Sequence, residues 1–517
     1  MLLTLLAKEI KVHLMTFRFN ASLIVTFMLV VLSVWVLGND FVARNNLYIQ
    51  LSESYSEGSD QIFVPSQIRP ILHKPPTPMS IFAQGKERRL GNTVVFSRWS
   101  VPSDAVDHLT NNKLTSDRVS YDLMTIFLLV ISLFGLLLTY DAISGEREKG
   151  TLRLQCSYGF SRASIYAVKF AAGFIVISLP FLISFISALL VLNFLHGIAF
   201  TGEQWFALVL MIAAGLLYSA IFVAIGLVCS AIAQRSSSSL VLALLFWSLG
   251  ILLVPSASNG LAKFIIPLLP PEEIEELELA TGAELKQQLE DYRRDITPGA
   301  GQGSWMGAWI VDENVAMFDT FSVAQYEHNV EYVRFQEALK QDRADRIWNA
   351  QRAHLVRDED QAGLASILSY ISPAQQLRAA FTQLSATGYR SHEEFLDACR
   401  RYRTTILNDF RERGYFDSNA HDFFMRLPRE LFRTDEQFEA RWREYWPYIE
   451  QGIPFEQARQ ATGYFDEPLP DDFIPPFRYR GSRPDFDTAL LPIGILALMA
   501  ILTFFIGFAI FLRYDVR

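Results

Sequence analysis

The stretch Asp141–Lys169, DAISGEREKGTLRLQCSYGFSRASIYAVK, lies between two apolar runs that are each long enough to cross a bilayer. It is the most charged of the short loops between such runs, and Leu152 and Leu154 stand among its polar residues. This mixture predicts a short helix on the membrane face, where a partner outside the membrane can push it. The residues that we single out in this loop are Ser144, Gly145, Glu146, Arg147, Glu148, Gly150, Thr151, Ser161, Arg162 and Lys169.

Composition argues against a soluble enzyme with a single core, because 50% of the 517 residues are hydrophobic and 13% are aromatic. Apolar runs of roughly 17 to 25 residues predict membrane spans. We expect an α-helical polytopic membrane protein with six transmembrane helices, and the fifth of the apolar runs is the shortest. The runs are Ala21–Leu37, Tyr121–Thr139, Phe170–Phe194, Phe206–Ala233, Leu240–Val254 and Ala489–Leu512.

The first run is expected to be a retained span, because no small-x-small cleavage site follows Leu37. Before it, Leu2–Phe19 is predicted to form an amphipathic helix in the membrane interface. Its apolar side is formed by Leu2, Leu3, Leu6, Ile10, Leu14 and Phe17, with Lys8, Lys11 and Arg18 largely elsewhere. The alternative is a cytoplasmic extension of the first span.

Six spans place both termini on one side of the membrane, and the basic residues indicate that this side is cytoplasmic. The basic residues that flank the spans on that side are Lys8, Lys11, Arg18, Arg147, Lys149, Arg153, Arg162, Lys169, Arg235, Arg513 and Arg517. The predicted organisation is an interfacial helix at 1–19, a span at 20–38, a first extracytoplasmic segment at 39–120, spans two to five at 121–254 with the loop at 141–169, a large extracytoplasmic domain at 255–487, and the last span and cytoplasmic tail at 488–517.

The large outer segment is predicted to be mainly helical, since apolar residues recur at helical spacing along it. Ser372 followed by Pro373 reads as the capped start of a helix. In the first outer segment, Thr93–Val101 is rich in β-forming residues and predicts a strand. The helices are expected near Glu272–Arg294, Val323–His354, Ser372–Ala386 and His392–Phe410.

The cysteine and histidine residues that could serve catalysis or metal binding are far apart in the sequence and form no recognisable motif. Cys156, Cys229 and Cys399 fall in separate regions, so no intrachain disulfide and no metal-ligand spacing is expected. The run His392–Glu394 does not form a zincin motif. No G-x-x-x-x-G-K-[ST] motif occurs, so if ATP drives this protein we expect another subunit to bind it.

The loop resembles the inner loop of ABC-2-type transporter permeases. The match is carried by S-G-E-R-E-K-G-T-L and S-R-A-S-I-Y-A-V-K within Ser144–Lys169. It is supported by A-K-E-I near the N-terminus, P-x-P-M-S-I-F-x-x-G at Pro76–Gly85 and the final R-Y-D-V-R. The large outer segment is similar to that of a subfamily with an extended periplasmic domain, and this departure from compact members leaves the substrate open.

The resemblance implies that the loop contributes a coupling helix to a separate ABC ATP-binding subunit, which holds ATP and Mg. Glu146, Arg147 and Glu148 would be the charged gate and coupling contacts, and Gly150 and Thr151 would set the turn. The working unit would carry two permease copies, as a homodimer or a related heterodimer, and two ATPases. The location implied is a bacterial cytoplasmic (inner) membrane, in contact with lipid; no nucleic acid partner and no cofactor in this chain are expected.

Two function classes fit this interpretation. The first is an exporter permease that moves a lipid, peptide or other amphiphile. The second is a mechanotransmitter, in which ATP hydrolysis moves the outer domain against an extracytoplasmic partner without substrate crossing the membrane. A third class, an outer-face hydrolase anchored in the membrane, lacks an assembled motif. We favour the exporter, because the resemblance to ABC-2-type transporter permeases supports it.

Overall fold

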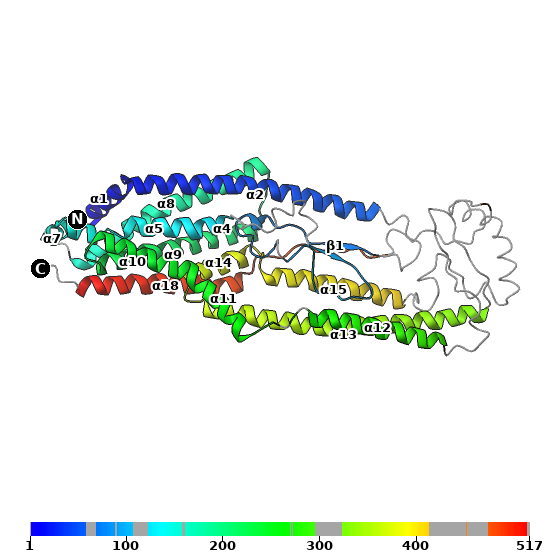
Figure 1. Ribbon diagram of the computed structural model, residues 1–517. Coiled ribbons are helices and arrows are strands. Elements are labelled where there is room, and N and C mark those ends of the chain that lie inside the picture. Colours follow the sequence, from blue (N-terminus) through cyan, green and yellow to red (C-terminus); the bar gives the residue numbers. More distant parts are fainter. Residues whose placement is uncertain are drawn as a thin grey trace.

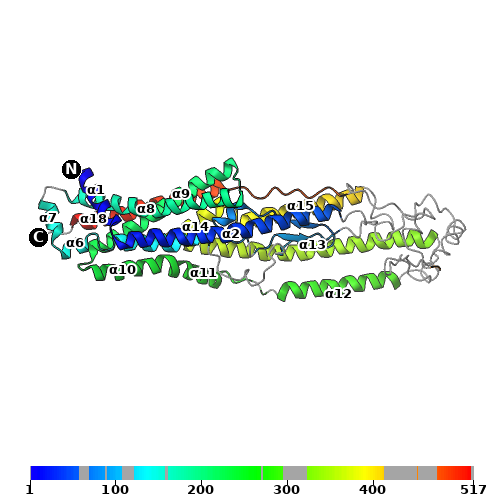
Figure 2. The same ribbon diagram turned by 90° about the horizontal axis from the view of Figure 1, so that it is seen from above.

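Long apolar helices form a bundle at one end of the molecule (Figures 1 and 2). The computed structural model describes residues 2–57, 69–87, 90–106, 122–157, 161–268, 270, 272–294, 323–412, 451 and 474–513. Within those residues, 6 helices are long and apolar enough to cross a membrane, in agreement with the expected runs. They are Phe17–Ser52, Leu123–Glu148, Arg162–His196, Gly202–Ile232, Ser236–Ile265 and Phe486–Arg513.

Several spans extend beyond the apolar runs that predict them. The clearest case is the first helix, which continues past Leu37 to Glu57 and so includes the start of the predicted outer segment. Spans two and five each contain a π-helical turn. The elements of the bundle are α2 (Phe17–Glu57), α4 (Leu123–Ile126), η4 (Phe127–Ile131), α5 (Ser132–Thr139), α8 (Arg162–His196), α9 (Gly202–Ile232), α10 (Ser236–Ser248), η5 (Leu249–Leu253), α11 (Val254–Ile265) and α18 (Phe486–Arg513).

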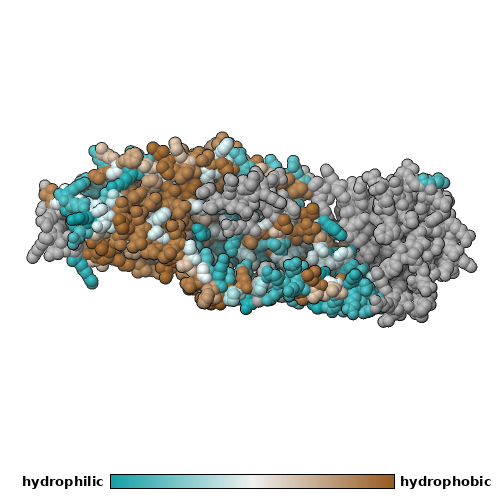
Figure 3. Space-filling view, viewed as in Figure 1, coloured by the Kyte–Doolittle hydropathy of each residue, from teal (hydrophilic) through white to brown (hydrophobic). Residues whose placement is uncertain are grey.

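The start of α1 (Leu2–Leu14) and the end of α18 lie at the same end of the bundle, which we call the basal end; the opposite end is the distal end (Figure 1). The α6 (Ser144–Glu148) and α7 (Thr151–Ser157) helices also lie at the basal end. In the view of Figure 3, hydrophobic residues cover the bundle, and hydrophilic residues become frequent on the helices beyond it. This distribution is the one expected of a membrane-embedded bundle with a polar extension.

Small residues bring three of the bundle helices into close contact. A Cβ placed at Gly226 of α9 would lie 2.0 Å from Thr139 Oγ1, and one at Gly173 of α8 would lie 2.8 Å from Thr139 Cγ2. Thr139 is fully buried and donates its hydroxyl to the carbonyl of Gly135 at 2.8 Å. Glycine is therefore required at position 226 for steric reasons, as close helix packing in membranes often demands.

One side of helix α1 packs against the protein. Leu5, Glu9 and His13 lie on this side, at four-residue spacing along the helix. On the predicted apolar side, Ile10 and Leu14 are partly buried against the core, whereas Leu2, Leu3 and Phe17 are exposed, and Phe17 belongs to α2. A short break at residues 15–16 separates the two helices, so α1 is distinct from the first span and is not a continuous extension of it.

Beyond the bundle, helices dominate the described residues, together with a small antiparallel sheet. Strand β1 (Ile71–His73) pairs with β2 (Thr93–Val95), with Leu72 opposite Val94. The predicted strand Thr93–Val101 is thus too long, because pairing ends where the chain turns after Phe96. The distal helices are α12 (Glu272–Arg294), α13 (Val323–Leu368) and α15 (Tyr389–Glu412).

One helix of the predicted outer segment packs into the bundle. It is α14 (Pro373–Leu384), which begins as predicted, since the Ser372 hydroxyl accepts a hydrogen bond from Gln375 N at 3.3 Å. Its buried apolar side chains belong to the same core cluster as those of the spans. It contacts α9 and α18 and lies between α13 and α15 in the chain, so it joins the bundle to the distal helices (Figure 1).

Candidate functional site

The loop 141–169 forms a compact cap on the basal end of the bundle. Gly150 separates α6 from α7 and adopts a left-handed conformation with φ of 72°, which favours glycine. The Thr151 hydroxyl donates to the carbonyl of Glu146 at 3.3 Å, across this turn. Leu152 is buried in the bundle core, whereas Leu154 is 55% exposed. The short helix α7 therefore has an anchored side and a side that faces outward.

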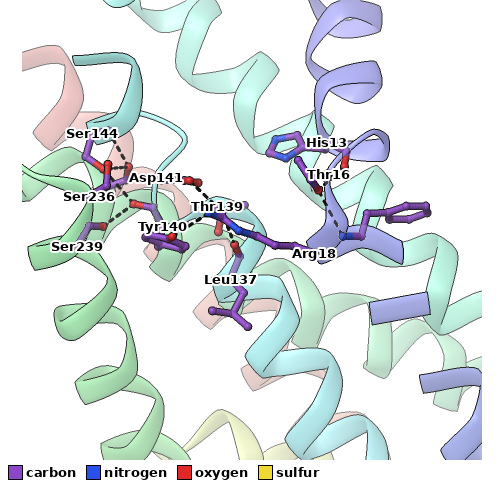
Figure 4. Close-up of polar contacts among 12 residues, drawn as sticks. His13, Thr16, Arg18, Leu137, Thr139, Tyr140, Asp141, Ser144, Ser236 and Ser239 are labelled. Atoms are coloured by element: carbon purple, nitrogen blue, oxygen red, sulfur yellow. Dashed lines mark hydrogen bonds and ion pairs between the residues drawn. The ribbon is translucent and has the colours of Figure 1, made fainter. Parts of the chain in front are cut away.

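The start of the loop is attached to the end of α9. The backbone N–H groups of Ile143 and Ser144 both donate to the Ser230 hydroxyl at 2.9 Å. The Ser144 hydroxyl lies 3.2 Å from that of Ser230, and Ser144 is fully buried. Ser239 of α10 donates to the carbonyl of Tyr140 at 2.5 Å, a contact drawn in Figure 4. This part of the loop is therefore bonded to both α9 and α10.

Arg147 and Glu148 hold the turn between spans four and five. The Arg147 guanidinium donates to the carbonyls of Ala233 at 2.7 Å and Ala231 at 3.2 Å, where α9 ends. Glu148 accepts from the backbone N–H of Ser236 at 3.1 Å and from its hydroxyl at 2.8 Å, where α10 begins. Carbonyls at a helix C-terminus and N–H groups at an N-terminus lack partners within their own helix. The loop supplies both partners.

Glu146 belongs to a buried ionic cluster that joins three elements. The Lys169 ammonium of α8 lies 2.9 Å from Glu146 and 3.5 Å from Glu9 of α1. The side chains of Lys169, Glu9 and Glu146 are 2%, 7% and 21% exposed. Gln155 of α7 donates to the other oxygen of Glu146 at 3.0 Å. Because breaking a buried ion pair is costly, these groups keep α1, α8 and the loop together.

A second ionic contact connects the loop with the first span. Arg18, at the start of α2, donates to Asp141 at 2.8 Å and to the carbonyl of Leu137 at 3.1 Å (Figure 4). Its second nitrogen donates to the Tyr140 hydroxyl at 2.9 Å. Together with the cluster around Lys169, this contact connects the loop to both N-terminal helices.

The remaining residues expected in the site have helix-end or spacing roles. Ser161 caps α8, where its hydroxyl accepts from Ser164 N at 3.1 Å. Arg162 donates to the carbonyl of Leu512 at 3.3 Å near the end of α18. A side chain at Gly145 would meet only ordinary contacts, the nearest being Ser236 Oγ at 3.5 Å. All ten residues therefore lie at the basal end, and the side chain of Cys156 in the same loop lies outside the described residues.

The sequence analysis missed several contributors to this site, among them Glu9, Arg18, Ser230 and Ser236. Glu9 shares a helix face with Leu5 and His13, but only the structure shows that this face is buried. A carboxylate on a buried face requires a cation, which Lys169 provides here. Ser230 and Ser236 carried no signal, because serine is common in membrane helices.

In the part of the chain that the structure describes, no three His, Cys, Asp or Glu residues are grouped so as to hold a metal ion. Cys229 and Cys399 are buried and unbridged. Charged side chains of the loop and its surroundings thus connect it to α1, α2, α8, α9 and α10, and its outward side is formed by Lys149, Gly150, Thr151 and Leu154.

The comparisons with known proteins agree with this geometry. The family model described as ABC-2 family transporter protein matches residues 3–516. A probable ABC transporter permease protein NosY from Stutzerimonas stutzeri is 34% identical over 123 residues, which cover 24% of this chain and 45% of that protein. The protein of the same name from Pseudomonas aeruginosa is 33% identical over 129 residues, with 24% and 45% covered. The chain thus matches less than half the length of these relatives.

The family model covers nearly the whole chain, and the spans observed are those of a multi-pass membrane protein. Permeases of this kind work as membrane subunits in association with an ATP-binding subunit. This chain belongs to the ABC-2 family of transporter proteins.

Proposed function

We propose that this protein is the membrane-spanning permease subunit of an ABC exporter, in which the loop 141–169 docks a separate ATPase subunit that binds ATP and Mg. The observation that carries this proposal is the division within the loop. The side chains of Glu146, Arg147 and Glu148 bind elements of the bundle, and Glu148 is exposed as well, like Lys149, Gly150 and Leu154. A partner can reach the exposed residues, and the side chains that bind the bundle carry its movement inward.

A movement of the loop can reach the bundle through three contacts. Arg147 acts on the end of α9, and Glu148 acts on the start of α10. Glu146 acts on α8 through Lys169. Rigid helices that slide or rotate against one another convert such a local push into a change of packing. The basal end is then cytoplasmic, in a bacterial inner membrane, and two copies of the permease assemble with two ATPases.

The mechanotransmitter is a second candidate, favoured by α14. This helix packs on α9 and α18 and continues into α13 on one side and α15 on the other. A rearrangement of the spans therefore moves both distal helices, which can act on an extracytoplasmic partner. The exporter remains our first choice, because the relatives are named permeases.

The test of the coupling role is the ATPase rate of the complex with its ATP-binding subunit, reconstituted in lipid. Leu154→Asp, on the outward side, should reduce co-purification of the ATPase. Glu146→Ala combined with Glu148→Ala should retain co-purification but uncouple hydrolysis from the permease. Glu203→Ala, at the distal end of α9, is the matched control and should change neither. If the loop variants behave like this control, the loop is not the coupling element.

The two candidate functions are separated by spin labels on Glu203→Cys, at the distal end of α9, and Arg411→Cys, near the end of α15. The mechanotransmitter requires the distance between these labels to change when ATP is bound. An exporter whose distal helices move as one body with the bundle leaves that distance constant.

A further inference from the structure

Helix α14 lies in the bundle but carries a polar face. Its buried residues include Leu377 and Phe381, which pack in the core of the spans. Gln375, Arg378 and Thr382 follow one another at spacings of three and four residues, so they share the opposite side of the helix. Gln375 and Thr382 are half-buried, and Arg378 is exposed.

The ends of α14 indicate its depth. Ser372 immediately precedes α14. Its hydroxyl donates to the carbonyl of Gly250 at 2.6 Å, in the middle of the fifth span. Near its last residue, the carbonyl of Gln383 accepts from Asp485 N at 3.2 Å, next to the start of α18. The helix therefore occupies the distal half of the bundle (Figure 1).

The polar face of α14 has unused hydrogen-bonding groups. Among the described residues, the side chains of Gln375, Arg378 and Thr382 make no hydrogen bond and no ion pair within 4.0 Å. Asp122 is a buried carboxylate that senses the charge of Arg378, but it is already engaged by the N–H groups of Gln84 at 2.9 Å and Thr125 at 2.8 Å. Among the described residues, no carboxylate therefore lies in ion-pair contact with this guanidinium.

Exposed apolar side chains precede α14 in the chain. Immediately before α14, Ile371 is 78% exposed and Tyr370 is 37% exposed, and Ile367 at the end of α13 is 60% exposed. A cation at membrane depth is unfavourable unless an anion or water accompanies it. The planar guanidinium fits phosphate oxygens in pairs, which makes a phosphate beside apolar chains the matching ligand.

We propose that Arg378, with Gln375 and Thr382, binds the phosphate of a phospholipid from the distal leaflet, whose acyl chains lie along Tyr370 and Ile371. The amide of Gln375 and the hydroxyl of Thr382 donate to the same headgroup. This site is distinct from the loop at the basal end, and it functions whether or not an ATPase docks there.

The experiment measures lipid retention by the detergent-purified chain in native mass spectrometry. The probe is palmitoyl-oleoyl phosphatidylglycerol, compared with palmitoyl-oleoyl glycerol, which lacks the phosphate, and with soluble glycerol 3-phosphate as competitor. Arg378→Gln should bind the phosphatidylglycerol about tenfold more weakly, the loss expected for one charge-assisted pair. Arg378→Lys should bind with intermediate affinity, since it keeps the charge without the paired geometry.

Arg352→Gln is the matched control, because Arg352 is also an exposed arginine, on α13 beyond the bundle. It should bind like the unaltered chain. The proposal is overturned if Arg378→Gln retains the phosphatidylglycerol unchanged, or if the lipid without phosphate binds equally well. It is also overturned if glycerol 3-phosphate displaces the lipid at equal concentration, because the site would then be one for small anions.

Discussion

At the scale of single residues, the most constrained group is Lys169. Its ammonium contacts two carboxylates that come from separate elements, Glu9 of α1 and Glu146 of α6, and its side chain is 2% exposed. Removing the charge of one partner from a buried ionic cluster leaves the others without compensation. The cluster is therefore suited to hold the loop in one position relative to α8.

Lys169→Met should destabilise the protein by about 3–5 kcal/mol, because Glu9 and Glu146 would remain as buried carboxylates without a cation. Thermal unfolding of the purified chain measures this loss. Adding Glu9→Gln and Glu146→Gln to Lys169→Met should restore most of it, since no uncompensated charge then remains. If the triple variant is as unstable as the single one, the loss comes from packing and not from charge.

The distal helix α15 should lose stability in acid because of His392. Burial, together with the neighbouring cations Lys74 and Arg400, lowers the pKa of His392 to about 4. The unfolded chain takes up a proton near pH 6.5 while the folded chain does not, so this contribution is present above pH 6.5 and is lost as the pH falls to about 4. The loss amounts to at most about 3 kcal/mol.

Hydrogen exchange of the α15 amides between pH 7 and pH 4 measures this effect. His392→Gln should flatten the dependence on pH. The same change at the half-buried His354 of α13 should leave the dependence in place. Equal slopes for all three proteins would show that His392 is not responsible.

At the scale of elements, helix ends are completed by residues that are distant in the chain. The residue before α10, Arg235, makes no side-chain cap, and Glu148 accepts from Ser236 across 88 positions of sequence instead. The end of α9 is held by Arg147 in the same way. The turn between spans four and five is thus assembled by the loop, and its geometry depends on where the loop stands.

The contact of α5 with α9 should not tolerate a side chain at Gly226. Gly226→Ala places a methyl group against Thr139 and should destabilise the protein by about 1–3 kcal/mol through overpacking. Thr139→Ala should relieve part of this loss, and a double-mutant cycle on thermal unfolding detects the coupling. Gly494→Ala in α18 is the control, because a Cβ there meets nothing within 4 Å. Equal effects at both glycines would contradict the packing account.

At the scale of the whole molecule, the chain combines an apolar bundle with a polar helical extension at its distal end (Figures 1 and 3). The two parts are joined by α2, by α11 leading to α12 and α13, and by α14, which re-enters the bundle. A buried helix between the two long distal helices thus links the extension to the spans.

The orientation predicted from the basic residues can be tested by cysteine labelling in intact spheroplasts. Lys149→Cys, on the basal loop, should be protected from a membrane-impermeant maleimide until the cells are opened, because the basic residues predict a cytoplasmic location for that end. Arg352→Cys, on the distal helix α13, should react at once. The unaltered chain, with Cys229 and Cys399 buried, provides the background. The reverse pattern of labelling would invert the topology.

Local patterns were sufficient for much of the architecture. Six apolar runs predicted the spans, and Ser372 with Pro373 predicted the start of α14, because hydrophobic length and helix capping are properties of a few neighbouring residues. The loop was recognised from its own charges and from its resemblance to a family. The strand over Thr93–Val101 was predicted too long, since pairing depends on a partner as short as β1.

By itself, the sequence determined that the chain crosses a membrane several times and which loop carries the charges, because both follow from composition along the chain. Only the tertiary structure decided what those charges do. Glu146 meets Lys169 and Glu9, and Glu148 meets Ser236, through contacts between residues far apart in sequence. It also decided that α14 lies among the spans with Arg378 exposed, since the depth of a helix depends on the elements that surround it and not on its own residues.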